Sequence, residues 1–312
     1  MQIIRHFSNT PASAKNCVIA LGNFDGIHLG HKEVIKRAVA LAKENDLPSA
    51  IMTFEPHPLS LFKPDIEPFR ITPLREKFRL VEKLGIDFIF TIRFDYNFSL
   101  ITAEEFIEKI LVGYVSAKHI VIGYDFIFGH QRGGNAELLR SLSGKYGYKL
   151  TQVKEVTEKD GNICSSTKIR DYIRRGNIKA ADKILGHDYV ISGRVRKGEQ
   201  RGRELGFHTA NIKLKNHIRP AFGVYSANVC VERKWYDAVL NIGKRPTFDG
   251  NEELLEVHLF DFSDDLYGKN LQIKLKKHIR SEIKFDNIEE LKTQIEKDFI
   301  VAKEFFKNKE EG

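Results

Sequence analysis

The first half of the chain alternates between two hydrophobic periods, one typical of strands and one typical of helices. Apolar runs with strand character occur at 17–21, 49–54, 87–92 and 119–123. Apolar positions recur at helical spacing in the segments between them, over 29–45, 72–85 and 102–112. This alternation predicts a parallel sheet covered by helices.

Capping signals sharpen the ends of two of these helices. Thr72 is a candidate N-cap with Pro73 in the first helical position, and Gly85 is a candidate stop. Thr102 and Glu105 have the spacing of a capping box. We therefore expect helices to begin at these two threonines.

The pattern changes beyond Gly186. Two short helical stretches, 167–175 and 178–185, precede this point. Short β-branched or aromatic runs follow, namely VISGRV, GVYSANVCV, WYDAVLNIG, LLEVHLFDF and LQIKLKKHI. Turn residues separate them, which predicts an antiparallel sheet or a small barrel. Asp286 and Glu289 then suggest the cap of a last helix over 287–307.

Length and composition fit two globular domains. The 312 residues are about two domains' worth, and we expect the division near residue 186, giving 1–186 and 187–312. Apolar residues make up 42% and charged residues 29%, as in ordinary soluble proteins, and no apolar run approaches a membrane span. The net charge of +8 suits anionic ligands but is too small to indicate nucleic acid by itself.

The cysteines and the N-terminal stretch indicate a reducing compartment. Cys17, Cys164 and Cys230 are far apart, so neither a zinc site nor a disulfide framework is indicated. Residues 1–16 have no apolar segment of the kind found in signal peptides. We expect a cytoplasmic protein.

The run GNFDGIHLGH, residues 22–31, joins the first predicted strand to the first predicted helix. Its glycines let the backbone approach a ligand, and the helix start presents N–H groups and a partial positive charge that suit phosphate. His28 and His31 are three residues apart, so both rings can face the same ligand. A turn with two satisfied histidines is one alternative. A metal pair is another, although no third ligand is evident.

This run resembles the H-x-G-H signature of nucleotidyltransferases. Its longer form is similar to the FAD synthetase module of bacterial bifunctional riboflavin kinase/FAD synthetases. Three further segments resemble that module: TFEPHP (53–58), VIGYDFIFGHQRGGN (121–135) and CSSTKIRDYIRRG (164–176). The resemblance implies a Rossmann-like nucleotidyltransferase domain, a parallel sheet with helices on both faces.

The same resemblance implies the residues of an adenylyl-transfer site. His28 and His31 would contact ATP phosphates and stabilise the transfer. The implied ATP-binding residues are Gly22, Phe24, Asp25, Gly26, His28, His31, Ser165, Ser166, Thr167 and Arg170. The implied flavin-binding residues are Asp125, Phe126 and Phe128.

A second glycine- and arginine-rich segment, GEQRGRELGFHTANI, covers residues 198–212. It is no Walker loop, because the chain contains no G-x-x-x-x-G-K-[ST]. Such a loop between strands can still surround phosphates with backbone N–H groups, although a basic hairpin loop is the plainer interpretation.

This segment resembles the G-R-x-L-G-F-P-T-A-N signature of the riboflavin kinase module, which implies a small antiparallel Greek-key barrel with a terminal helix. The implied ATP-binding residues are Gly198, Gly202, Arg203, Gly206, Thr209 and Asn211. Thr209 and Asn211 would also hold Mg²⁺, and Glu256 would be the catalytic base. His208 stands where the family has Pro, so the turn is expected to be looser or the kinase weaker.

Together the resemblances imply a two-site enzyme that uses ATP as co-substrate. It would convert riboflavin to FMN and then FMN to FAD, without nucleic acid or membrane partners, as a monomer or weak homo-oligomer. Three alternatives stay open: an adenylyltransferase whose kinase is impaired through His208, a non-catalytic flavin-binding regulator, and a protein like aminoacyl-tRNA synthetases. Against the last alternative, this chain contains no K-M-S-K-S motif.

Overall fold

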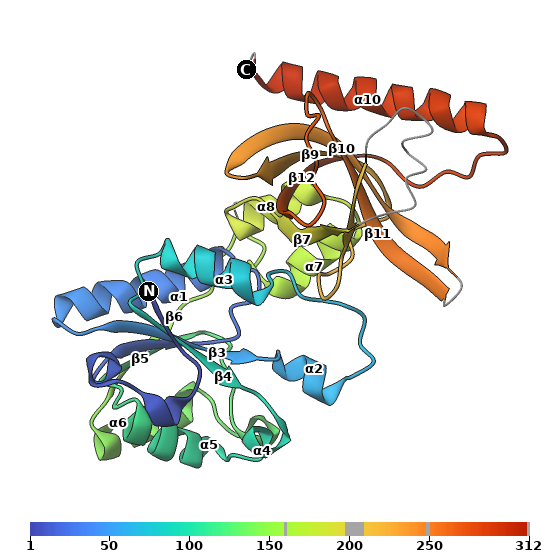
Figure 1. Cartoon of the computed structure of the whole chain (residues 1–312). Helices are drawn as coiled ribbons and strands as arrows, with labels where there is room; N and C mark the ends of the chain where they lie inside the picture. Colours follow the sequence, from blue (N-terminus) through green and yellow to red (C-terminus); the bar gives the residue numbers. More distant parts are fainter. Residues whose placement is uncertain (159–160, 197–208, 248–249, 311–312) are drawn as a thin grey trace. The chain divides into compact units, whose positions relative to one another are not determined.

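A computed structural model describes residues 1–158, 161–196, 209–247 and 250–310 of the chain (Figure 1). The chain forms two units. The first consists of Met1–Glu67 and Thr72–Ser165, and the second of Pro68–Ile71 and Ser166–Gly312. Each unit is built around its own sheet.

The first unit contains a six-stranded sheet in the order β1-β4-β3-β2-β5-β6. Every neighbouring pair is parallel. The strands are β1 (Gln2–Ile4), β2 (Val18–Leu21), β3 (Ser49–Glu55), β4 (Phe88–Arg93), β5 (His119–Gly123) and β6 (Lys149–Val153). The predicted parallel sheet is confirmed, with β1 and β6 as edge strands that the hydrophobic pattern did not reveal.

Seven helices connect or flank these strands in the described part of the unit, besides short 3₁₀ turns. They are α1 (Leu29–Glu44), α2 (Pro58–Phe62), α3 (Leu74–Glu82), α4 (Tyr96–Ser99), α5 (Ala103–Glu105), a π-helix (Phe106–Tyr114) and α6 (Ala136–Tyr146). The short helices α2 and α4 and the longer α6 were not predicted. The 3₁₀ turns are Phe7–Asn9, Ala12–Ala14 and His130–Arg132.

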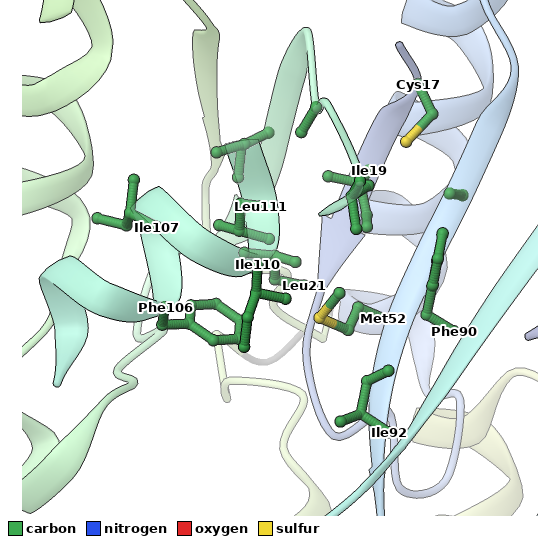
Figure 2. Close-up of a cluster of buried hydrophobic side chains, with 14 of the residues drawn as sticks. Cys17, Ile19, Leu21, Met52, Phe90, Ile92, Phe106, Ile107, Ile110 and Leu111 are labelled. Carbon is green, nitrogen blue, oxygen red and sulfur yellow. The ribbon is translucent and has the colours of Figure 1, made fainter. Parts of the chain in front are cut away.

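Two apolar cores cover the two faces of this sheet, since successive strand residues point to opposite sides. On one face the strands pack against the π-helix, as Figure 2 shows for Ile19, Leu21, Met52, Phe90, Phe106, Ile110 and Leu111. On the other face they pack against α1; this cluster includes Val18, Ala20, Ile51, Val34, Ile35 and Ala38. The predicted arrangement, with helices on both faces, is confirmed.

The predicted helix ends are partly correct. The capping box is confirmed: Glu105 N–H donates to Thr102 Oγ1 at 3.2 Å, and Thr102 N–H donates to Glu105 Oε2 at 3.1 Å. The prediction at Thr72 was wrong, because the N-cap of α3 is Pro73 and α3 ends at Glu82, before Gly85. Thr72 donates its backbone N–H to the carboxylate of Asp25.

The second unit contains a closed six-stranded barrel in the order β10-β11-β8-β7-β12-β9. Every neighbouring pair is antiparallel. The strands are β7 (Val190–Arg196), β8 (Ala210–Lys213), β9 (Gly223–Val231), β10 (Lys234–Thr247), β11 (Gly250–Leu259) and β12 (Asn270–Arg280). Because β12 returns beside β9 after the run β9-β10-β11, the predicted Greek-key barrel is confirmed.

Three helices accompany the barrel in its described part. α10 (Ile288–Glu310) covers the outside of the barrel, where Ala302 and Phe306 pack with Val224, Val239 and Phe260. Its cap lies one residue later than predicted, because Asn287 Oδ1, not Asp286, accepts the Glu290 N–H at 2.9 Å.

The other two helices of this unit are α7 (Ser166–Arg174) and α8 (Ile178–Leu185), which match the predicted ranges within one residue. The structural unit therefore begins upstream of residue 186. Where the two functional domains divide remains a prediction.

A half-buried carboxyl group links α8 to the start of β7. Asp182 Oδ1 accepts the Tyr189 N–H at 2.6 Å. Burial raises the pKa of Asp182 to about 7, and nearby Asp188 adds to the rise, while the hydrogen bond, Lys276 and Lys274 oppose it. Asp188 itself pairs with both lysines. Asp182 therefore titrates near neutral pH in the folded protein.

We expect Asp182→Asn to make the barrel more stable than the parent at pH 8, with a smaller gain at pH 5. The folded pKa lies above the unfolded one, so this group's stabilising contribution is complete below about pH 4 and is lost as the pH rises through 7. Asn keeps the acceptor and never ionises. The gain is of the order of a few kcal/mol at most, since one pKa unit is about 1.4 kcal/mol.

Urea unfolding at the two pH values measures this difference. Asp264→Asn, which removes an exposed carboxylate in the same unit, is the control and is expected to show no such pH dependence. Equal effects of Asp182→Asn at pH 5 and pH 8 contradict the prediction.

Candidate functional site

The turn between β2 and α1 has an unusual backbone. Phe24, Gly26 and Ile27 have φ values of +48°, +96° and +44°. Phe24 and Ile27 are fully buried. A positive φ is costly for residues other than glycine, above all for a β-branched one, and it persists only where the surrounding structure holds it. This turn is therefore a strained segment fixed by its environment.

His28 and His31 meet at the start of α1. His28 is the N-cap, its Nδ1 accepts the His31 N–H at 3.4 Å, and the two rings stack with centroids 3.6 Å apart. An accepting Nδ1 places the proton of a neutral His28 on Nε2. A Cβ on Gly30 would lie 3.1 Å from the His28 ring, so glycine leaves the space that this ring occupies.

Phe24 and Asp25 face the protein interior. The Phe24 ring lies edge-on to His31 at 5.4 Å, and a Cβ on Gly22 would lie 3.0 Å from it. Asp25 is buried, and its Oδ1 accepts the Thr72 N–H at 3.0 Å. These two predicted ATP-binding residues therefore anchor the turn through their contacts with the protein interior.

Lys77 of α3 is a residue of this site that the sequence analysis missed. Its side chain is 0% exposed, and Nζ donates to the Asn23 carbonyl at 2.7 Å and to Thr53 Oγ1 at 3.0 Å. The available signal was its position one helical turn before Val81, on the buried face of α3. A lysine on an apolar helix face indicates a buried polar partner.

The other predicted ATP-binding residues belong to the stretch 165–170. Cys164 approaches the start of α1, because its carbonyl oxygen lies 3.7 Å from where a Cβ of Gly30 would be. Ser165 is the last residue of the first unit, whereas Ser166, Thr167 and Arg170 belong to the second.

Arg170 is engaged within the second unit. Its Nε donates to the Phe69 carbonyl at 2.9 Å, and its guanidinium lies 5.4 Å from the centre of the Phe69 ring. The residue therefore also joins α7 to the short segment Pro68–Ile71.

The predicted flavin-binding residues lie on a loop after β5. Asp125 is exposed, Phe126 is half-buried and Phe128 is buried in the core. The two phenylalanine rings stack with centroids 5.5 Å apart. Phe128 therefore supports Phe126 from the core side, and Asp125 and Phe126 are the members that a ligand can reach.

The barrel brings Glu256 and Asn211 together. Glu256 on β11 pairs with Asn211 on β8 and with Asn241 on β10, so the three side chains form a row across three strands. Leu255 and Val257 point into the barrel and are fully buried, which leaves Glu256 on the outer face, half-buried.

Asn211 has the buried polar atom expected of a ligand-binding residue. It is 8% exposed, and its Oδ1 has no hydrogen-bond partner among the residues that the structure describes. Thr209 directly precedes β8 and is half-buried. Gly198, Gly202, Arg203, Gly206 and His208 lie outside the described residues.

A second carboxylate on this face was missed. Oε1 of Glu282 lies 2.1 Å from where a Cβ of Gly243 would be, next to the Asn241 amide. Gly243 follows Asn241 by two residues and therefore lies on the same side of β10. No sequence pattern joins Glu282 to this strand, because barrel closure brings the two together.

The described part of the chain has neither a metal-ligand cluster nor a membrane-spanning helix. It contains no group of three His, Cys, Asp or Glu side chains placed to hold a metal ion. None of its helices is both long and apolar enough to cross a membrane.

Comparisons with known proteins divide along the same lines. The FAD synthetase family model matches residues 10–167, and the riboflavin kinase family model matches residues 185–306. The bifunctional riboflavin kinase/FMN adenylyltransferase of Escherichia coli (strain K12) is 41% identical over 308 residues, 98% of each chain. The protein of the same name from Bacillus subtilis (strain 168) is 41% identical over 297 residues, 93% of each chain.

One solved structure covers nearly the whole chain. The crystal structure of Macrolide-efflux Protein from Streptococcus pneumoniae has a TM-score of 0.85 at 34% identity, and the match covers 96% of this chain and 98% of that one. The two family models match successive parts of the chain, and the relatives are 41% identical over almost its full length. The chain therefore belongs to the family of bifunctional riboflavin kinase/FMN adenylyltransferases.

Proposed function

We propose that the chain catalyses two successive reactions at two separate sites. The barrel phosphorylates riboflavin with ATP to give FMN and ADP, and the first unit transfers the adenylyl group of a second ATP to FMN, giving FAD and pyrophosphate. The observation that carries this proposal is that the residues assigned to the two chemical steps lie in different units: His28 and His31 in the first, Asn211 and Glu256 in the second.

Adenylyl transfer needs positioning and positive charge more than a base. The phosphate of FMN is mostly a dianion at neutral pH, because its second pKa is about 6, so it is already a nucleophile. It attacks the α-phosphorus of ATP, and pyrophosphate leaves. The N–H groups at the start of α1 and the Nε2–H of His28 are donors suited to the phosphate charge that develops. His31, stacked on His28, is proposed to share this role.

Riboflavin phosphorylation does need a base, because its nucleophile is a neutral hydroxyl group. We assign this role to Glu256, which takes the proton from the ribityl hydroxyl as the γ-phosphate arrives. Its half-buried place on the outer face, beside Asn211 and Asn241, supports the assignment.

The barrel residues fit a magnesium ion. The oxygen of Asn211 is buried and without a described partner, and Thr209 and Asn211 supply the neutral oxygen donors that Mg²⁺ accepts beside nucleotide phosphates and water. When bound, the ion would neutralise the charge that develops on the phosphates of ATP.

We also propose that the enzyme acts in the cytoplasm as a monomer or weak homo-oligomer, with riboflavin, FMN and ATP as its partners and neither nucleic acid nor membrane. The thiols of Cys17, Cys164 and Cys230 support a reducing compartment.

We expect His28→Ala combined with His31→Ala to abolish FAD formation from FMN and to leave FMN formation from riboflavin unchanged. Loss of the donors at the start of α1 removes stabilisation of the developing phosphate charge, worth about 100-fold or more in rate. Chromatography of the flavins after incubation with ATP and Mg²⁺ measures both reactions. The control is His6→Ala, an exposed histidine of the same unit; an equal loss of both reactions would refute independent sites.

We expect Glu256→Gln to stop FMN formation while FAD formation from supplied FMN continues. Gln keeps the size of the side chain but cannot accept the proton, so the rate falls by about 100-fold or more. Glu296→Gln, an exposed change on α10, is the matched control. Loss of FAD synthesis in a folded Glu256→Gln protein contradicts the assignment. A parent protein that makes FAD only from added FMN would instead support an impaired kinase.

We expect Asn211→Ala to raise the Mg²⁺ concentration that half-saturates the kinase by about 10-fold or more, because an inner oxygen donor is lost. A magnesium titration of FMN formation gives this value. Asn270→Ala, at an exposed position, is expected to leave the titration unchanged. An unaltered magnesium requirement in Asn211→Ala excludes this residue as a ligand.

A further inference from the structure

The polar contact beneath the strained turn involves two donors and one carbonyl group. The Asn23 carbonyl accepts from Lys77 Nζ at 2.7 Å and from Thr53 Oγ1 at 3.0 Å, and Lys77 Nζ also donates to Thr53 Oγ1 at 3.0 Å. Thr53 and Lys77 are both 0% exposed. The network is therefore screened from water, where a charge-assisted hydrogen bond is strong and costly to break.

Anchoring this carbonyl determines where the N–H of the same peptide group points. The peptide bond from Asn23 to Phe24 is trans, because the only cis bond described is at Glu55-Pro56. In a trans peptide the C=O and N–H bonds point in opposite directions. The Phe24 N–H must therefore point away from Lys77, toward the opposite side of the turn.

The turn that follows needs such an anchor. Phe24 and Ile27 both have positive φ, and neither is glycine, so each has a backbone conformation that costs free energy. A rotation of the peptide group from Asn23 to Phe24 would relieve the strain at Phe24. The donors at the Asn23 carbonyl oppose this rotation.

We propose that Lys77 is a positioning residue for adenylyl transfer. Its buried ammonium group holds the Asn23 carbonyl and thereby keeps the turn from Phe24 to His28 in the conformation that binds the phosphates of ATP. This inference rests on the proposed function, which makes residues 22–31 the ATP-binding turn of the first unit. Lys77 itself does not contact the substrate.

The test compares Lys77→Met and Lys77→Gln with the parent protein in full-length form. Met removes both charge and donor with little change in length, and Gln keeps a donor without charge. We expect the KM for ATP in FAD synthesis to rise by about 10- to 100-fold in Lys77→Met, because a small displacement of binding groups costs this much, and less in Lys77→Gln. The KM for FMN is expected to stay within twofold.

Two controls in the same protein separate positioning from folding. FMN formation by the barrel is expected to be unchanged in all variants. Lys83→Met makes the same substitution at an exposed position at the C-terminal end of α3 and is expected to leave the KM for ATP unchanged. A parent protein that makes no FAD from FMN refutes the proposed function, whereas an active parent with an unaltered KM in Lys77→Met refutes only the role of Lys77.

Thr53→Val keeps the proposal testable even if Lys77→Met does not fold. Valine has nearly the shape of threonine but cannot donate to Asn23, so we expect the same increase in KM for ATP, smaller in size. The double variant of Thr53→Val with Lys77→Gln is expected to be less impaired than the product of the single effects, because both act through one carbonyl. The proposal is overturned if Thr53→Val has the KM of the parent protein. It is also overturned if the effect of the double variant equals the product of the two single effects.

Discussion

The proposed adenylyl-transfer site depends on holding a short stretch of backbone in a conformation that it would not adopt alone. Phosphate recognition at a helix start requires the preceding turn to present N–H groups outward, and here the turn has positive φ at buried Phe24 and Ile27. Two polar contacts oppose the strain from below, Asp25 with the Thr72 N–H and Lys77 with the Asn23 carbonyl. Both partners come from the region of α3, so this helix, remote from the motif in sequence, is part of the site.

In the barrel, strand register rather than backbone strain places the proposed site residues. The proposed kinase reaction has an alcohol nucleophile and needs a base near the phosphates, and the antiparallel pairing sets Glu256, the proposed base, directly opposite Asn211. Barrel closure separates the two sides of β11, so the apolar Leu255 and Val257 fill the interior while Glu256 remains on the outer face. α10 covers another part of that outer face through Val224, Val239 and Phe260. The carboxylate is thereby held on a rigid strand.

Much of this could be predicted where one hydrophobic period dominates. The central strands and α1 are buried on one or two faces, so their ranges follow from apolar spacing. β6 was missed because its residues are all exposed or half-buried and include no apolar run. β1 has only three residues at the sheet edge. The cap expected at Thr72 was misplaced by one residue, since Pro73 is the N-cap of α3. Thr72 N–H donates to Asp25, a contact over 47 residues that no local pattern encodes.

The sequence by itself determined the two motif sets, their order along the chain, the parallel-sheet and barrel classes, and the alternation that puts Glu256 opposite to Leu255 and Val257. These depend on local spacing or on the match of short motifs. Only the tertiary structure revealed the buried Lys77 beneath the turn, the buried oxygen of Asn211 and the place of Glu282 at Gly243. Each of these depends on segments far apart in the chain, and burial, hydrogen bonding and steric room are properties of such neighbours rather than of a residue's own position in the sequence.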